Sequence, residues 1–517
     1  MNRIKLLILP IIVFAVGCKK MLQETVYTSI NPDNVYATKE DIDAAVVSAF
    51  SIYNSTPTML FPVFDVQSEY MSASELPNIK IFEDYTYAST TATTANFYAH
   101  NYVAINRCNA IIDRVPRQSK IDATLQKVYI AEAKWLRAWA YFNLVRLWGP
   151  VPLKLKETRT VSDFNVPASP VKTIYDSIVA DLKTAMTDLP NKRNAGVISE
   201  KGRPNKGTAE FLLGKVYLTM AGLPLKDGSH LSEARDLLLD LYKNPLQYGF
   251  TLFNDFGQSF SLDGNPVNPV YQSGAKPLGA DPTEIVFGIG HSTSTSPSFP
   301  STMSYYTLPT LSVESSSGGN GLIGVTSSFG DLYESSDKRK TIGLITQWTN
   351  ATTKVVNVYG TSGYGSPGGI SGGYYIGKYR AQSGRVGTGI ITFDNDQVIY
   401  RFADVYLMLA EIYNELDGPA ADAFKYLNEL RARAGASAFT SQQAGTQDSF
   451  RDIIYNERLR EFIYEGHVIF DLRRWGRLQK AMLADPRPAG SRPVYKPEYE
   501  LFPLPIAEVL NNPELNN

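Results

Sequence analysis

Three glutamates spaced four residues apart come closest to an acid/base constellation in this chain: Glu457, Glu461 and Glu465. Glycoside hydrolases place two carboxyl groups on opposite sides of a sugar, about 5 to 9.5 Å apart. Residues four apart on a helix instead share one face, where their like charges repel. The same segment holds the arginines that could offset this repulsion: Arg458, Arg460, Arg473 and Arg474. Because arginine pairs with carboxylates through two hydrogen bonds, we expect a structural ion-pair network here and no catalytic residue.

The sequence gives little support for a metal site or for a nucleic-acid-binding surface. The four histidines are dispersed and none has a zinc-ligand spacing, so we predict neither a metal nor a cofactor: His100, His230, His291 and His467. The 50 basic and 51 acidic residues give a formal net charge of −1. A nucleic-acid-binding protein carries a basic excess on one face, so no nucleic-acid partner is expected.

Aromatic side chains are better candidates for binding. The chain contains 31 tyrosines and 5 tryptophans. Such rings stack on the apolar faces of sugars, while amide and charged groups hold the sugar hydroxyls. The candidates that lie in a proline-, glycine- and serine-rich stretch are Tyr305, Tyr306, Trp348, Tyr374 and Tyr375.

Two helical blocks flank that stretch, and they must position it. We divide the chain into 1–17, 18–243, 244–396 and 397–517, which are a leader, a helical region, a loop-rich lobe and a second helical region. Short alternating runs in the lobe, such as 284–289, predict strands. Periodicity and end signals predict helices at 96–115, 127–148, 171–189, 208–220, 231–242, 400–416 and 419–434. The fold class is therefore mostly α with an irregular lobe, and the loops of such a lobe usually carry function.

The helices also resemble one another. Residues 213–217 match 409–413, with a small residue three positions before a tyrosine. A small residue lets a neighbouring helix approach closely, and the tyrosine packs over the same face. This pattern predicts tetratricopeptide-like helix pairs, which are stable only when they stack.

The N-terminus has the pattern of an exported lipoprotein. Residues 6–16 form an apolar run of eleven residues after Arg3 and Lys5. As a helix this run spans about 16 Å, too short for a bilayer of about 30 Å, so 1–17 is predicted to be a signal peptide. Residues 15–18 resemble a bacterial lipobox, which predicts that Cys18 is lipidated and holds the protein to a membrane.

Several segments together resemble the SusD/RagB family of outer-membrane nutrient-binding lipoproteins. They follow one another in the order typical of that family and cover nearly the whole mature chain: 136–153, 202–209, 427–435, 455–476 and 502–515. The longest of them contains Tyr455-Asn456-Glu457-Arg458 and ends in Arg473-Arg474-Trp475-Gly476. The chain is thus identified as a member of the family because all these segments occur together in the expected order, and no single motif would suffice.

The resemblance implies a fold and a role. It implies a scaffold of four tetratricopeptide-like units with a variable lobe, on the outer membrane and facing the cell exterior. It also implies capture of an oligosaccharide ligand and its delivery to a SusC-like TonB-dependent transporter. In starch-binding relatives, an aromatic residue and an asparagine three positions later contact the ligand at a helix start. Tyr98 and Asn101 match this pair, with core packing as the alternative.

Other functions stay open at this point. Some relatives of the family capture peptides or glycopeptides for a RagA-type transporter. A surface glycoside hydrolase or esterase would need two facing carboxylates in a groove. A purely architectural partner of the transporter would lack an aromatic platform.

Overall fold

The structure is a computed structural model. It describes residues 35–55, 63–74, 77–160, 163–192, 202–260, 282–291, 301–312, 319–379, 396–485, 487 and 492–516. The predicted signal peptide and the predicted lipidation site, Cys18, lie outside the described residues.

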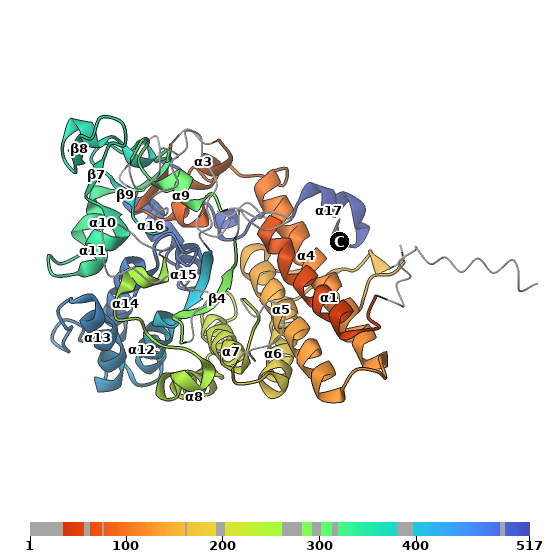
Figure 1. The fold of residues 1–517 in the computed structure, drawn as a ribbon. Coiled ribbons are helices and arrows are strands. Elements are labelled where there is room, and N and C mark those ends of the chain that lie inside the picture. Colours follow the sequence, from red (N-terminus) through yellow and green to blue (C-terminus); the bar gives the residue numbers. More distant parts are fainter. Residues whose placement is uncertain are drawn as a thin grey trace, which may run out of the picture.

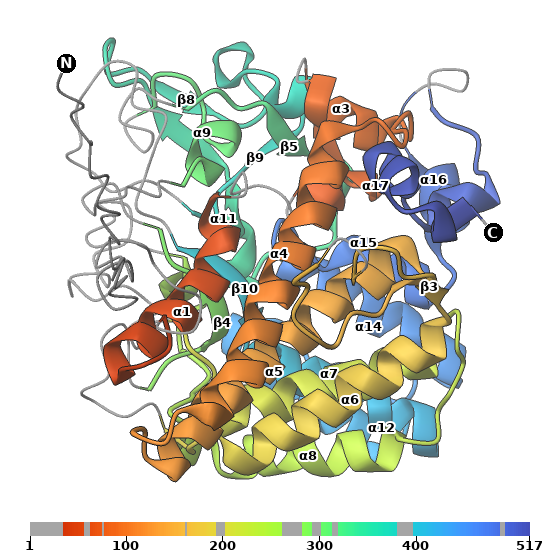
Figure 2. The same ribbon diagram turned by 90° about the vertical axis from the view of Figure 1, so that its right-hand side faces the viewer.

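A row of helices forms the frame of the molecule. Each helix packs against the next one in the row, except that the last helix packs against the third from the end. Figure 1 shows this frame along the lower and right-hand part of the molecule, and Figure 2 shows α4, α5 and α6 side by side. Its members are α1 (Lys39–Ser51), α4 (Ala92–Arg114), α5 (Ala123–Trp148), α6 (Val171–Asp188), α7 (Lys206–Ala221), α8 (Leu231–Lys243), α12 (Ala403–Asp417), α13 (Ala421–Ala434) and α14 (Gln447–Phe462). The predicted mostly helical fold of paired helices is confirmed.

Local sequence signals set the ends of these helices. The side chains of Thr38, Asn205 and Thr446 accept hydrogen bonds from backbone N–H groups at the starts of α1, α7 and α14. Such caps satisfy donors that the helix itself leaves unpaired. Gly435 ends α13 in the left-handed conformation, with φ +75°. Helix α5 is buried on nearly every side, as a central helix of a large domain must be.

A second, mixed region forms the lobe at the upper left of Figure 1. Its four-stranded antiparallel sheet has the order β1-β5-β9-β6, and a separate hairpin, β7–β8, lies beside it. The strands are β1 (Met71–Ala73), β5 (Ile323–Val325), β6 (Leu344–Ile345), β7 (Gln347–Thr349), β8 (Val356–Val358) and β9 (Tyr374–Ile376). Three short helices accompany them: α9 (Met303–Thr307), α10 (Ser327–Asp331) and α11 (Lys338–Gly343). Strand β1 comes from the N-terminal region, so the lobe is not built from 244–396 alone.

A two-stranded antiparallel sheet joins the lobe to the second helical block. It consists of β4 (Ile285–Ile289) and β10 (Gln397–Arg401), and all ten residues are buried. The strand predicted near 284–289 is confirmed. The helix predicted from residue 400 begins only at Ala403, because Tyr400 and Arg401 pair with β4.

The remaining elements close the molecule. They are α3 (Pro77–Glu83), β2 (Val151–Pro152), β3 (Ala168–Ser169), α15 (Val468–Arg474), α16 (Leu478–Ala484) and α17 (Ile506–Asn511). The C-terminal tail returns to α5, where the Phe502 N–H donates to the Leu147 carbonyl at 2.7 Å and the Trp148 indole donates to the Pro503 carbonyl at 3.2 Å. Most buried apolar residues of frame and lobe belong to one continuous core.

Candidate functional site

Tyr98 and Asn101, the pair predicted at a helix start, lie inside the core on α4. The ring of Tyr98 is 2% exposed and packs edge-on against Trp148, with 5.2 Å between ring centroids. Asn101 is fully buried: its Oδ1 accepts a hydrogen bond from the Tyr53 hydroxyl at 3.0 Å, and its Nδ2 donates to the Phe97 carbonyl at 2.7 Å. These contacts are those of the core-packing alternative. Because a ligand has no ring face to stack on here, the candidate site is placed elsewhere.

The five aromatic residues predicted in the lobe lie together. A small core, separate from the main one, holds Leu308, Ile345, Trp348, Tyr364 and Tyr375, with Tyr305 and Tyr359 packed against it. The Tyr305 and Tyr306 rings meet edge to face at 5.0 Å, and the Tyr359 and Tyr374 rings stack in parallel at 3.8 Å. We call seven residues the lobe aromatic cluster: Tyr305, Tyr306, Trp348, Tyr359, Tyr364, Tyr374 and Tyr375.

Strand β9 explains how two neighbouring tyrosines serve different purposes. Successive residues of a strand point to opposite faces. Tyr374 therefore joins the main core, while Tyr375 joins the small core. Glycines make room for both rings: a Cβ on Gly330 would lie 2.3 Å from the Tyr374 ring, and one on Gly321 would lie 2.3 Å from the Tyr375 ring. Gly321 also has φ +58°, a conformation that side chains with a Cβ rarely adopt.

The lobe aromatic cluster has an inner and an outer tier. Trp348, Tyr364, Tyr374 and Tyr375 form the inner tier, and each is at most 8% exposed. Tyr305, Tyr306 and Tyr359 form the outer tier and are partly exposed. The buried rings therefore hold the outer rings in fixed positions, which lowers the entropy that a ligand must remove on binding.

Hydrogen bonds fix the polar ends of these rings. Asn320 donates from Nδ2 to the Tyr305 hydroxyl at 3.2 Å, and the Tyr359 hydroxyl donates to the Gly372 carbonyl at 2.7 Å. The Trp348 indole donates to the Tyr364 carbonyl at 3.2 Å. Sequence reasoning did not select Tyr359 as a site residue, although its place in a tyrosine- and glycine-rich run was a usable signal.

The three glutamates considered at the outset are buried in an ion-pair network between the lobe and the second helical block. Glu461 contacts Arg339, Arg401 and Arg433 at 3.0, 2.8 and 2.5 Å. Glu465 contacts Arg401 at 2.8 Å and Lys378 at 2.6 Å. We call the network the ionic junction: Glu284, Glu334, Asp337, Arg339, Lys378, Arg401, Arg431, Arg433, Glu457, Arg460, Glu461 and Glu465. It contains six acidic and six basic side chains, so its charges balance.

The charges of the ionic junction are held in place by one another. Burial raises the pKa of Glu457, but Arg339, Arg460 and Arg431 outweigh this effect and bring the pKa to about 2. Burial lowers the pKa of the Lys378 ammonium to about 8 in spite of the opposing charge of Glu465. A carboxylate whose oxygens are already engaged by arginines is poorly suited to acid/base work.

The predicted ion-pair network is confirmed, but most of its predicted partners are wrong. Arg460 pairs with Glu457 at 2.8 Å, as expected. Arg458 and Arg474 instead contact Asp471 in a neighbouring cluster, at 2.6 and 2.9 Å. Arg473 donates to the Tyr499 carbonyl at 3.2 Å. The true partners of the glutamates come mainly from the lobe, β10 and α13, which are distant in sequence.

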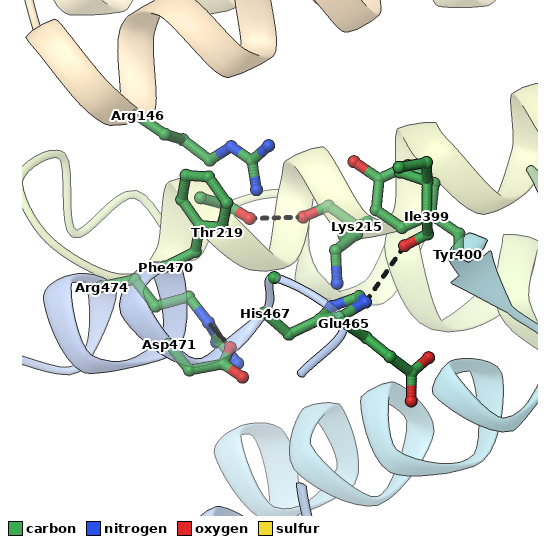
Figure 3. A pocket seen from close by; sticks show the side chains of 11 residues that line it. Arg146, Lys215, Thr219, Ile399, Tyr400, Glu465, His467, Phe470, Asp471 and Arg474 are labelled. Atoms are coloured by element: carbon green, nitrogen blue, oxygen red, sulfur yellow. Dashed lines mark hydrogen bonds and ion pairs between the residues drawn. The ribbon is translucent and has the colours of Figure 1, made fainter. Parts of the chain in front are cut away.

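A cavity of about 20 Å³ lies between α5, α7, β10 and the turn before α15 (Figure 3). That volume holds about one water molecule. Figure 3 shows the charged ends of Arg146 and Lys215 directed into this space, with His467 on the opposite side. The His467 Nε2 lies 3.1 Å from the Ile399 carbonyl, and burial, followed by the charge of Lys215, lowers its pKa to about 3. The cavity is too small for a sugar ring, so it does not compete with the lobe aromatic cluster as a ligand site.

Within the described residues, no group of three or more histidine, cysteine, aspartate or glutamate side chains is placed to hold a metal ion. None of the described helices combines the length and the apolar character that a membrane crossing requires.

Two family matches cover most of the chain. Residues 283–517 match the SusD family, and residues 21–218 match a family described as starch-binding associating with outer membrane. The chain belongs to the SusD/RagB family. The resemblance inferred from the ordered motifs is therefore confirmed.

Individual SusD-like proteins resemble this one along nearly their whole length. SusD-like protein P25 of Formosa agariphila is 26% identical over 544 residues, covering 96% of this chain and 95% of that protein. A SusD superfamily protein of Parabacteroides distasonis superposes with a TM-score of 0.75 at 25% identity, over 92% of this chain and 98% of that one. A laminarin-binding SusD-like protein shares the fold, with a TM-score of 0.71 at 22% identity over the same 92% and 98%.

Two of the five segments that indicated the SusD/RagB family supply residues of the ionic junction. Segment 455–476 runs through α14 and α15 and supplies Glu457, Glu461 and Glu465. Segment 427–435 lies on α13 and supplies Arg431 and Arg433. The most recognisable residues of this SusD/RagB protein therefore serve its architecture, and the lobe aromatic cluster lies outside them.

Proposed function

We propose that this SusD/RagB-family protein binds oligosaccharide or polysaccharide at the cell surface and does not cleave it. The observation that supports this proposal best is the lobe aromatic cluster. Two partly exposed tyrosines, Tyr305 and Tyr359, pack against the small core, and the partly exposed Tyr306 packs against the main core beside Tyr305. Tyrosine presents an apolar face to the C–H groups of a sugar and a hydroxyl to its polar edge.

The expected affinity is modest. A ring contact of this kind contributes about 1 kcal/mol beyond area burial, and sugar hydroxyls already form good hydrogen bonds to water. Several rings must therefore act on one chain of sugars. The hairpin β7–β8 lies at the outer end of the lobe in Figure 1, away from α5, α6 and α8, which favours access by a long polymer.

The proposal extends to an anchor and a partner. Lipidation of Cys18 would hold the protein on the outer membrane, facing the cell exterior, in keeping with the family description for residues 21–218. The bound saccharide would then pass to a SusC-like TonB-dependent transporter. Family membership supports this partner.

A role in hydrolysis is less well supported. Glu457, Glu461 and Glu465 are the carboxylates whose spacing first invited it, and arginines or lysine engage all three. Binding also needs no reacting group, whereas a hydrolase needs two free carboxyl groups on either side of the sugar.

A binding panel tests the proposal. The mature protein, with its anchor, is purified in a detergent that lacks a sugar headgroup and is titrated with polysaccharides and with peptides. We expect binding to at least one polysaccharide, no release of reducing ends, and co-purification of a TonB-dependent transporter from the native membrane. Catalytic cleavage would contradict the proposal, and binding of peptides alone would favour capture of peptides or glycopeptides for a RagA-type transporter.

A further inference from the structure

The segments that build the lobe aromatic cluster are almost free of charge. They are 301–312, 319–325 and 344–376, and they contain a single charged side chain, Lys354. Across the whole chain, 20% of residues are charged. Charged residues of soluble proteins lie mostly at the surface. The low charge of these segments is therefore a local feature, because the rest of the chain is charged to the usual extent.

The hairpin beside the cluster continues this uncharged surface. Gln347 pairs with Val358 and Thr349 with Val356, and alternation along the strands places these four side chains on one face. Val356 and Val358 are 54% and 44% exposed. Trp348 lies on the opposite face and is buried in the small core. The outward face of the hairpin therefore offers apolar, amide and hydroxyl groups, and none of its four side chains is charged.

The one charged side chain does not reach toward the rings. Lys354 donates from Nζ to the Ala351 carbonyl at 2.6 Å, within the turn that connects β7 and β8. Its ammonium thus lies back over its own turn. A cation held in this way is not placed to pair with an anionic ligand on the cluster.

The ring faces are also free of cations within the described part of the chain. Tyrosines of the frame provide the contrast: Lys425 lies 5.3 Å from the ring centre of Tyr242 and 4.9 Å from that of Tyr426, and the Tyr242 hydroxyl donates to Glu429. No such contact falls on a ring of the lobe aromatic cluster in the described residues. A sugar can therefore approach the outer rings without displacing a charged side chain.

One carboxylate acts on a ring of the cluster. Burial alone raises the pKa of Tyr375. Burial, then Tyr359, then the carboxylate of Asp331 raise the pKa of Tyr374. A carboxylate offers no attraction to an anionic ligand.

We infer that the lobe aromatic cluster selects uncharged glycans, such as neutral hexose or pentose polymers, and discriminates against uronate-containing and sulfated polymers. The inference rests on the proposed function. A carboxylate or sulfate that leaves water needs a cationic or hydrogen-bonding partner, and the only cation in these described segments, Lys354, is held over its own turn. Neutral hydroxyls need only the amides and tyrosine hydroxyls that the surface does supply, among them Asn320 and Gln347.

A matched panel tests the inference. The mature protein is titrated with laminarin, starch, xylan and mannan, and with alginate, polygalacturonate and a sulfated galactan, at physiological salt. We expect the best neutral polymer to bind at least tenfold more tightly than any acidic one. Equal or tighter binding of an acidic polymer would overturn the inference and leave the proposed function intact. Binding of no saccharide at all would overturn the proposed function itself.

Two variants add a second test, in which each variant is compared with the natural protein on the same polymer. Asn320→Lys places a cation next to Tyr305, and we expect it to improve polygalacturonate binding at least threefold. Lys354→Ala removes the existing cation and should leave the affinities for acidic and neutral polymers unchanged. A loss of acidic-polymer binding in Lys354→Ala would show that this cation serves the site, contrary to the inference.

Discussion

The ionic junction and the lobe aromatic cluster differ in chemistry and in role: the first consists of charged side chains, and the second consists of uncharged rings. The junction balances twelve charged side chains, eleven of them buried, and joins parts of the chain that are far apart in sequence. The cluster presents rings at the surface and has almost no charge around it. Charged residues are thus concentrated in the junction, which stabilises the fold, and are scarce at the cluster, where we propose that a ligand binds. The densest group of ionisable residues in a chain need not be its functional site.

Breaking the junction should produce the largest effect. Arg401 is fully buried and contacts Glu284, Glu461 and Glu465. Arg401→Met leaves three buried carboxylates without their shared partner, and removing one member of a buried pair costs about 3 to 5 kcal/mol. We expect a fall of that size in the free energy of unfolding, measured with urea.

A surface ion pair provides the control. Lys172 and Asp176 form an exposed pair on α6, and such pairs contribute little. Lys172→Met should leave the unfolding midpoint unchanged. If both variants behaved alike, the junction would have no special role in stability.

The pH dependence of Glu457 sharpens the comparison. Its folded pKa, about 2, lies below the ordinary value of 4.5, so its ion pairs stabilise the fold above pH 4.5 and are lost as the pH falls toward 2. Glu457→Gln should therefore be less stable than the natural protein at pH 7, and this difference should shrink steadily between pH 4.5 and 2. A difference that stays constant over this range would contradict the assigned pKa.

The buried pair on α4 should give an intermediate effect on stability and none on binding. Asn101→Ala removes the acceptor of the buried Tyr53 hydroxyl. Leaving buried polar groups unsatisfied costs about 1 to 3 kcal/mol. Urea unfolding should register that loss, while glycan affinity stays within twofold. A large loss of affinity in a stably folded variant would restore the pair to the ligand site.

The outer rings should give the smallest single effects, and these should appear in binding only. Tyr305→Ala, Tyr306→Ala and Tyr359→Ala each remove one ring worth about 1 kcal/mol, so each should weaken glycan binding about fivefold. Tyr413→Ala, which removes a partly exposed ring from α12, is the matched control and should leave binding unchanged. Calorimetry separates these outcomes, and equal losses in all four variants would argue against the cluster as the site.

The helices were predictable because their signals are local. Periodicity, caps and stop residues placed α5, α6, α7, α8 and α13 to within a few residues. The pairing of β1 with β5 was not predictable, because its register joins Met71 to Val325 across about half of the chain. The start of α12 was misplaced for the same reason: Tyr400 belongs to a strand whose partner lies more than a hundred residues earlier.

The candidate site was likewise predictable only where its signals are local. Lobe aromatics such as Trp348 and Tyr375 were selected by type, on the expectation that glycine-rich loops seldom need so many rings for packing, but these two rings pack the small core. Which of them would be buried and which exposed depended on the alternation of β9 and on glycines such as Gly321, which only the assembled lobe reveals. Tyr98 and Asn101 shared a helix face as expected, but that face turned out to lie inside.

The lobe is fastened at a few points, and this has a consequence for how new specificities can arise. Its side of the junction consists of Glu284, residues 334–339 and Lys378, while hairpin β7–β8 lies between the last two of these. Exchange of this hairpin between relatives leaves the main-core residues of β6 and β9 in place and should therefore yield hybrids that fold on the same frame. In evolution, the same arrangement would allow insertions and replacements in that stretch without compensating changes in the helical frame.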